Sequence, residues 1–186
     1  MTIGKVPLVP TLVVLVAVAI MVRLGFWQLD RLAEKESLIA RYQTASLLAP
    51  LSAIPADAAP EDLHYRRAGF TCSTVSGWRD IAGRSATDQP GYVHIAQCPE
   101  GEVAIGWSEG PEPVEWAGGP VTGVISPGGD AGWRLVADPP QAGLEANALP
   151  DPSDLPNNHL AYAVQWFLFA LTALVIYALA LRKRWR

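Results

Sequence analysis

The fold is decided by the stretch NNHLAYAVQWFLFALTALVIYALAL, residues 157–181. From Leu160 to Leu181 the stretch has 22 residues without a charge. About 20 apolar residues, each rising roughly 1.5 Å along a helix, are enough to cross the ~30 Å hydrocarbon core of a bilayer. The stretch therefore predicts a second transmembrane helix over residues 157–181. His159 stands at the start of this helix, at a boundary between membrane and water.

An earlier uncharged run, Val6 to Val22, has 17 residues. A cleaved signal peptide is the alternative to a membrane helix here. The run exceeds the 7–15 residues usual for the apolar part of a signal peptide, and no small-x-small cleavage site follows it. Arg23 and Trp27 are instead typical of the interfacial end of a retained helix, because a long basic side chain and an indole both favour headgroup depth. We therefore predict the first transmembrane helix over residues 6–26.

Residues 27–44 predict a juxtamembrane amphipathic helix that continues the first span. They contain no Gly or Pro and are dense in good helix formers. Leu29, Leu32 and Ile39 fall on one side, which is suited to capping a soluble domain. The charged residues on the other side are typical of a solvated helix face, and a docking surface for a partner is the alternative.

Charge predicts the orientation in the membrane. The basic tail, residues 182–186, follows the second span directly, and Lys5 precedes the first. By the positive-inside rule both termini are expected in the cytoplasm of a bacterial cell, with an inner-membrane location and a periplasmic central domain. The segment from Asp30 to Asp154 holds all 18 acidic residues and eight of the 14 basic ones, a net charge of −10. Such a domain repels nucleic-acid phosphates and anionic lipid, so we expect no nucleic-acid partner.

The region between the spans, residues 45–156, predicts a small, mainly antiparallel β domain. A Pro- and Ala-rich linker, residues 49–60, excludes a long helix at its start. Short runs of β character follow, separated by Gly and Pro about every ten residues: 65–77, 91–98, 103–107, 121–126 and 133–137. This spacing favours an antiparallel sheet or small barrel over βαβ units. The expected fold is thus a membrane α+β protein, with two transmembrane helices flanking an extracytoplasmic β-rich domain.

Two cysteines, Cys72 and Cys98, each fall in a predicted strand. In an oxidising compartment such a pair is more often a disulfide than a redox site, and the two do not form a C-x-x-C motif. We expect a bridge between neighbouring strands that closes a loop of about 25 residues and adds ~2–4 kcal/mol of stability. A periplasmic thiol oxidoreductase is the alternative and needs both cysteines. Copper delivery has little support, because the sequence has no Cys/His cluster.

The sequence contains no H-E-x-x-H, G-x-S-x-G or P-loop motif, so hydrolase and nucleotide-binding functions have no support. His64 and His94 are isolated in sequence, and we interpret them as solvated or packed on the sheet. His159 is the strongest candidate for chemistry. The residues within about 40° of it around the helix are small or aromatic: Ala163, Trp166, Ala170, Ala173 and Tyr177.

Small residues on this face allow a helix or a flat ligand to approach closely. Spacing alone leaves two interpretations of His159 open. The histidine either anchors the helix end by hydrogen bonds to Asn157 or water, or serves as an axial ligand of a haem at the outer edge of the membrane.

Two segments carry a family resemblance: LGFWQLDR, residues 24–31, with Glu34 and Lys35 after it, and NNHLAYAVQWF, residues 157–167. Together they resemble the signatures of the Surfeit-locus-one family (the Shy-one proteins of yeast), which are assembly factors of cytochrome c oxidase. Both occur at matching places in a chain with two spans. The resemblance implies a protein, not an enzyme, that transiently binds haem a and assists its insertion into the oxidase catalytic subunit.

The resemblance also implies a site and partners. His159 takes the position of the family's haem-binding histidine, the ligand of the haem iron. Beyond the resemblance, we expect aromatic side chains at this site to cover the porphyrin: Trp27, Tyr162 and Trp166. From their charge and location, Arg23 and Arg31 are expected to pair with its propionates. The expected partners are the catalytic subunit and other assembly or haem-synthesis factors. A membrane scaffold that holds oxidase subunits without binding haem is the alternative.

The β domain departs from the family pattern. GYVH, residues 91–94, is similar to the Gly-Tyr-His opening of a family strand, and VAIGW, residues 103–107, resembles the segment ending in Arg-Gly-Trp-Val. Here Ile105 replaces the arginine and Ser108 follows the tryptophan. The two cysteines are also outside the general pattern. The resemblance therefore assigns no role to this domain.

Overall fold

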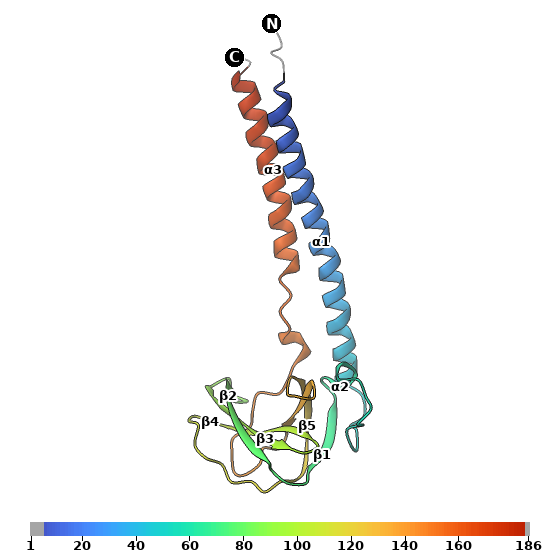
Figure 1. The fold of residues 1–186 in the computed structure, drawn as a ribbon, viewed down its shortest axis with the longest axis vertical. Coiled ribbons are helices and arrows are strands. Elements are labelled where there is room, and N and C mark those ends of the chain that lie inside the picture. Colours follow the sequence, from blue (N-terminus) through green and yellow to red (C-terminus); the bar gives the residue numbers. More distant parts are fainter. Residues whose placement is uncertain (1–5, 185–186) are drawn as a thin grey trace. The chain divides into compact units, whose positions relative to one another are not determined.

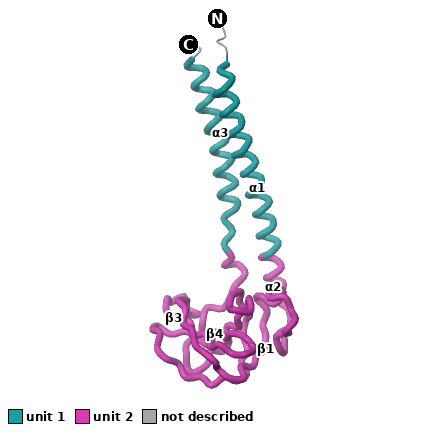
Figure 2. The backbone as a smooth tube through the Cα atoms, in the orientation of Figure 1, with its two compact units in different colours: residues 1–38, 156–186 teal, residues 39–155 magenta. Residues whose placement is uncertain are grey.

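The computed structural model describes residues 6–184, which form two compact units (Figure 2). The helix unit contains the described residues up to Leu38 and those from Pro156 onward, and the β unit spans Ile39–Leu155. The expectations for Lys5 and for positions 185 and 186 of the basic tail lie outside the described residues.

Two long helices make up most of the helix unit. Helix α1 (Leu8–Ser46) has 39 residues, and its last residues belong to the β unit; helix α3 (His159–Arg184) has 26. Within the helix unit they run antiparallel beside each other, so the start of α1 and the end of α3 lie at the same end of the pair (Figure 1). Pro10 falls in the first turn of α1, where a missing N–H is tolerated.

Both helices are long and apolar enough to cross a membrane. Most of the exposed large apolar side chains of the described residues belong to them. In water such a surface is costly, whereas in lipid it is matched by its surroundings. Three basic residues in the last turn of α3, Arg182 to Arg184, complement the partial negative charge of the helix C-terminus. These features fit a membrane protein.

The β unit is built on one six-stranded sheet with the order β1-β5-β6-β4-β3-β2. In chain order the strands are β1 (Arg67–Cys72), β2 (Gly77–Arg84), β3 (Pro90–Cys98), β4 (Gly101–Ser108), β5 (Gly119–Pro127) and β6 (Trp133–Ala137). Four neighbouring pairs are antiparallel and β4 pairs parallel with β6, so the sheet is mixed. Two short helical turns, α2 (Pro60–Leu63) and η1 (Pro152–Asp154), lie outside it.

Strand β2 is absent from the strands that the sequence predicts. Its residues alternate between half-buried and exposed, and it carries Arg79, Asp80 and Arg84, so its apolar periodicity is weak. The pairing with β3 runs in register from Gly77 opposite Gln97 to Arg84 opposite Pro90. Cross-strand polar partners, described below, take the place of the apolar contacts that usually reveal a strand.

The main core lies on one face of the sheet. It contains apolar side chains from five strands, with Ile105, Ile125 and Leu135 fully buried at its centre. A smaller cluster on the other face consists of Ile95, Ala104 and Val136. At ~25 cal/mol per Å² of apolar surface removed from water, the main core is the chief source of stability for this unit.

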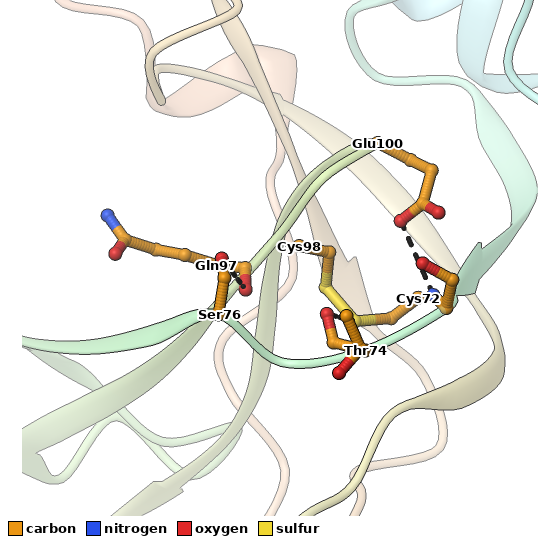
Figure 3. Close-up of a disulfide and its surroundings, with 7 residues drawn as sticks. Cys72, Thr74, Ser76, Gln97, Cys98 and Glu100 are labelled. Atoms are coloured by element: carbon orange, nitrogen blue, oxygen red, sulfur yellow. Dashed lines mark hydrogen bonds between the residues drawn. A yellow bond between two sulfur atoms is a disulfide. The ribbon is translucent and has the colours of Figure 1, made fainter.

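Cys72, which ends β1, and Cys98, which ends β3, form a disulfide whose Cα atoms are 5.5 Å apart (Figure 3). The expected bridge is therefore present, but the expectation of neighbouring strands is wrong, because three strands separate β1 from β3. In a flat sheet four strand spacings amount to roughly 19 Å. The sheet must therefore curl toward a barrel, and the disulfide holds the two ends of the curl together. Beside it, hydrogen bonding to Ser73 lowers the pKa of the Glu100 carboxyl.

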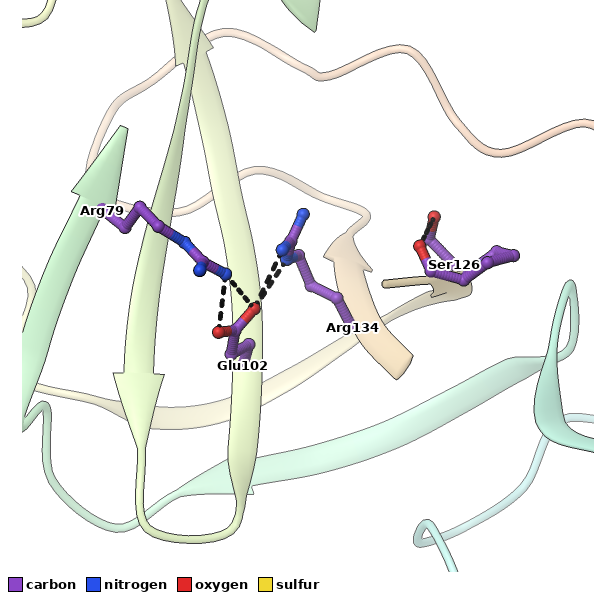
Figure 4. A network of polar contacts seen from close by, with 5 residues as sticks. Arg79, Glu102, Ser126 and Arg134 are labelled. Carbon is purple, nitrogen blue, oxygen red and sulfur yellow. Dashed lines mark hydrogen bonds and ion pairs between the residues drawn. The ribbon is translucent and has the colours of Figure 1, made fainter. Parts of the chain in front are cut away.

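A buried carboxylate ties three more strands together. Both oxygens of Glu102 on β4 accept from Arg79 on β2, at 2.7 and 2.8 Å, and one also accepts from Arg134 on β6 (Figure 4). The Glu102 side chain is 6% exposed and the Arg134 side chain 14%. Two cations compensate the desolvated carboxylate, which is the condition under which a buried charge is tolerated.

Candidate functional site

The two helices of the helix unit meet along a face of small residues. A Cβ on Gly25 would lie 2.6 Å from the Phe167 ring, so only glycine allows the present approach. Ala163 and Ala170, about one and three turns after His159 on this face of α3, are 1% and 4% exposed. The small-residue face of α3 therefore packs against a helix, which is one of the two uses that its composition predicts.

His159, the first residue of α3, makes a hydrogen bond with α1. Its Nδ1 lies 2.7 Å from Oε1 of Gln28. The anchor interpretation predicts a hydrogen bond between His159 and Asn157 or water. In the structure the partner is instead a side chain of the other helix. An amide oxygen only accepts hydrogen bonds, so Nδ1 carries the proton and donates.

The other ring nitrogen of His159 is available to a ligand. Nε2 makes no hydrogen bond with any of residues 6–184, and it is not among the buried polar atoms that lack a partner. With the proton on Nδ1, Nε2 keeps its lone pair. In a neutral imidazole this arrangement leaves Nε2 as the nitrogen that can bind a metal.

Two of the aromatic residues predicted for this site flank His159 on α3. Tyr162 is 52% exposed, and Trp166 is half-buried with its ring edge-on to Phe169 at 6.1 Å between centroids. Because helical positions turn by about 100°, Tyr162 and Trp166 both lie on the side of His159 away from Phe167, which contacts α1. They form an apolar surface beside the imidazole that α1 leaves uncovered.

The remaining predicted residues belong to a different side of α1. Trp27 and Arg23 lie two residues on either side of Gly25, a turn of about 200° each way, and are directed away from α3. Trp27 is 43% exposed, and the guanidinium of Arg31 stacks over its ring at 5.9 Å. Arg31 also pairs with Glu34. The structure therefore brings none of these three side chains to His159.

Gln28 is the residue that sequence reasoning missed. It lies inside the quoted segment 24–31, but its uncharged side chain gave no periodic or charge signal. A usable signal was a polar residue just beyond an apolar span, facing a second polar residue at the matching end of another span. Gly25 was missed as well, although a glycine inside a long helix usually has a packing reason.

The site offers features that suit haem a. It has one imidazole nitrogen without a hydrogen-bond partner among the described residues, and Tyr162 and Trp166 follow it on the same helix. Haem a is largely apolar, which suits such aromatic neighbours. The donor set of these residues is therefore compatible with one axial bond to haem iron.

The β unit contains a second polar arrangement. Nδ1 of buried His94 lies 2.8 Å from a carboxylate oxygen of Asp80, and Nε2 lies 2.6 Å from Oγ of Ser108. This order resembles a hydrolytic triad, but the Ser108 hydroxyl lies 2.6 Å from both His94 Nε2 and the Gly110 carbonyl, and His94 is only 1% exposed. We interpret the chain of bonds as structural, linking β2, β3 and β4. His94 is packed on the sheet, as its isolation in sequence indicated.

Both cysteines are buried in the disulfide and far from the surface exposure that thiol exchange requires. The thiol oxidoreductase alternative therefore has no support in the geometry.

Elsewhere in the β unit, the ring centroids of Tyr65 and Tyr42 lie 4.8 Å apart. Burial raises the pKa of the Tyr65 hydroxyl, and Tyr42, Asp154 and Asp151 raise it further.

Two apolar helices, separated in sequence by a disulfide-closed β unit, are compatible with a membrane protein, and the candidate site lies on the helices. The model of the SURF1 family, the Surfeit-locus-one proteins, matches residues 15–171 of the chain. The match includes both Gln28 and His159 and covers the whole β unit. The chain belongs to the SURF1 family, so the resemblance is confirmed. A search of curated proteins finds no match.

Membership gives the broad role. The SURF1 family is an assembly factor of cytochrome oxidase rather than a catalytic enzyme, and this role points to oxidase subunits as partners.

Proposed function

We propose that this protein binds haem a and assists its insertion into the catalytic subunit of cytochrome oxidase, with Nε2 of His159 as the ligand of the iron. The observation that carries the proposal is the hydrogen bond between Nδ1 and Gln28, because in the neutral ring it places the lone pair on Nε2, which has no hydrogen-bond partner among the described residues. When bound, the haem iron accepts the imidazole lone pair. Family membership supports the oxidase as destination.

Each neighbouring residue has a defined part in this proposal. Tyr162 and Trp166 supply apolar contact for a porphyrin face. Trp27, Arg23 and Arg31 are left out of the proposed site, because Trp27 and Arg23 are directed away from α3 and the Arg31 guanidinium stacks over Trp27. The haem propionates would then interact with water or with the recipient protein.

One imidazole suits a carrier that must also release its cargo. The other two histidines are engaged elsewhere: both nitrogens of His94 are hydrogen-bonded, and Nε2 of His64 contacts the Gly132 carbonyl. His159 would therefore be the one histidine of the described residues that holds the iron, and release of the haem would require only this one side chain to let go.

We further propose a bacterial inner-membrane location with both termini in the cytoplasm and the β unit in the periplasm. The basic residues at the end of α3 support this orientation, as does the disulfide, which forms in oxidising compartments. His159 then lies at the periplasmic edge of the bilayer. There a haem can pass between membrane proteins without entering water.

The test is the optical spectrum of the full-length protein purified in detergent from cells that make haem a. We expect a Soret band in the parent, its loss in His159→Ala, and its retention in the matched control His64→Ala. Equal haem in the parent and His159→Ala would contradict the ligand assignment. A parent without any Soret band would favour the scaffold that holds oxidase subunits without haem.

A further inference from the structure

Gln28 supplies the only hydrogen bond that the His159 ring makes within the described residues. It stands three residues after Gly25, almost one turn along α1 from the closest approach of the helices, and is half-buried. The proposed ligand is a ring nitrogen of His159. The role of Gln28 therefore lies in what its amide oxygen does to that ring.

The contact selects one form of the imidazole. A neutral histidine carries one N–H, on either nitrogen, and the two forms interconvert readily. An acceptor 2.7 Å from Nδ1 keeps the proton there and fixes the ring plane as well. In metal sites the nitrogen that does not bind the metal almost always donates to such an acceptor, which orients the ring and raises the basicity of the ligating nitrogen.

We infer that Gln28 is a positioning residue for haem binding: its Oε1 holds His159 in the Nδ1–H form, so that Nε2 is presented to the iron before the haem arrives. The inference rests on the function proposed above. It adds a residue of α1 to a site that otherwise lies on α3. Correct packing of the two helices thereby becomes a condition for haem binding.

A purely structural contact is the competing explanation. Hydrogen bonds between membrane helices contribute to helix association, so the same contact could serve only to join α1 and α3. The two explanations differ in what they require at position 28. Joining the helices is satisfied by any polar group that reaches the ring, whereas positioning requires an acceptor.

The variants follow from this difference. Gln28→Glu keeps an acceptor at nearly the same length, and Gln28→Leu removes the acceptor at similar volume. Gln43→Leu is the matched control, because Gln43 is an exposed glutamine of the same helix whose side chain makes no hydrogen bond within the described residues.

The first measurement needs no haem. Nitrogen-15 NMR of histidine-labelled, full-length protein in detergent reports which ring nitrogen is protonated, and the chain has only three histidines, so His159→Ala assigns the signal. We expect the Nδ1–H form in the parent, Gln28→Glu and Gln43→Leu, and a mixture in Gln28→Leu. An unchanged Nδ1–H form in Gln28→Leu would overturn the inference.

The second measurement is a titration of the same proteins with haem a, followed at the Soret band. Loss of a partner of this kind typically weakens metal affinity 10–100-fold, so we expect Kd to rise by about that factor in Gln28→Leu. Gln28→Glu should stay within about threefold of the parent, and Gln43→Leu should match it. Affinity retained in His159→Ala overturns the proposed function, whereas affinity lost in His159→Ala but retained in Gln28→Leu overturns the positioning role alone.

Discussion

In the β unit, segments far apart in the sheet are joined by a disulfide and by a carboxylate shared between two arginines, whereas in the helix unit two long helices meet through small residues and polar side chains. Thr11 and Tyr177 share a hydrogen bond at one end of the helix pair, and Gln28 and His159 share another at the opposite end. Several cross-links, one of them covalent, thus stabilise the β unit, whereas a few contacts hold the two helices of the helix unit together. One of those contacts includes the proposed haem ligand.

This difference indicates that the β unit and the helix pair have different roles. A β unit with a covalent closure and buried ion pairs resists local opening. A helix pair held by weak contacts can separate or shift at modest cost, because polar and van der Waals contacts between helices in lipid are individually small. Under the proposed function, transfer of a haem would require movement at His159, which lies on the helix pair.

The most damaging change in the β unit should be Glu102→Leu. It leaves Arg134, whose side chain is 14% exposed, as an uncompensated buried charge. Removing one partner of a buried pair typically costs about 3–5 kcal/mol. Urea unfolding of the full-length protein, followed by near-UV circular dichroism, measures the loss. A cost below ~1 kcal/mol would show that water reaches this carboxylate and that the β unit is less tightly fastened than described.

Replacing both cysteines with serine should come next. The bridge spans 26 residues, and closing a loop of that length restricts the unfolded chain by about 3–4 kcal/mol in the entropic model. The same urea experiment checks the value, with Ser46→Ala as a surface control. Unchanged haem binding in the double variant is expected as well, and its loss would revive a role for the cysteines.

A smaller effect is expected where the helices touch. Gly25→Leu places atoms where the Phe167 ring now lies, and overpacking of this kind typically costs about 1–3 kcal/mol. The helices should be forced apart near Gln28, so His159 should lose the Nδ1–H form in nitrogen-15 NMR. A second substitution, Phe167→Ala, should make room for the leucine side chain and restore the Nδ1–H signal of His159. An unchanged histidine spectrum in Gly25→Leu would show that the Nδ1–H form of His159 does not depend on how α1 packs against α3.

The smallest effect is a pH dependence in the β unit. The pKa of Tyr65 is raised from its ordinary value of 10.0, chiefly by burial. Below pH 10 both folded and unfolded forms are protonated. As pH rises above 10 the unfolded tyrosine ionises first, so folding stability falls until the folded pKa is passed, by at most about 1.4 kcal/mol per pH unit. Tyr65→Phe should remove this part of the decline, measured by urea unfolding at pH 9 and 11. Equal slopes in the two proteins would contradict it.

Sequence periodicity was most informative where apolar residues were continuous. The uncharged runs from Val6 and from Leu160 predict helices that the structure contains, although it extends α1 without a break to Ser46. The runs 91–98, 103–107, 121–126 and 133–137 fall within strands β3 to β6. In each case the apolar pattern follows from burial of one or both faces of the element.

What the sequence did not predict depends on tertiary partners. Strand β2 was missed because its charges find Glu102 and His94 only after the sheet has formed. The order of strands, and with it the span of the disulfide, depends on a parallel pair that local pattern does not encode. Likewise His159 was recognisable from its place at a helix end, but Gln28 became recognisable only when α1 and α3 were seen side by side.

The most direct test of the central claim is electron–nuclear double resonance of the ferric haem a complex, prepared with nitrogen-15 histidine. Only three histidines carry the label, and a labelled nitrogen bound to iron gives a hyperfine coupling that a distant one does not. We predict the coupling in the parent and in His64→Ala, and its absence in His159→Ala. A coupling that persists in His159→Ala would contradict the account.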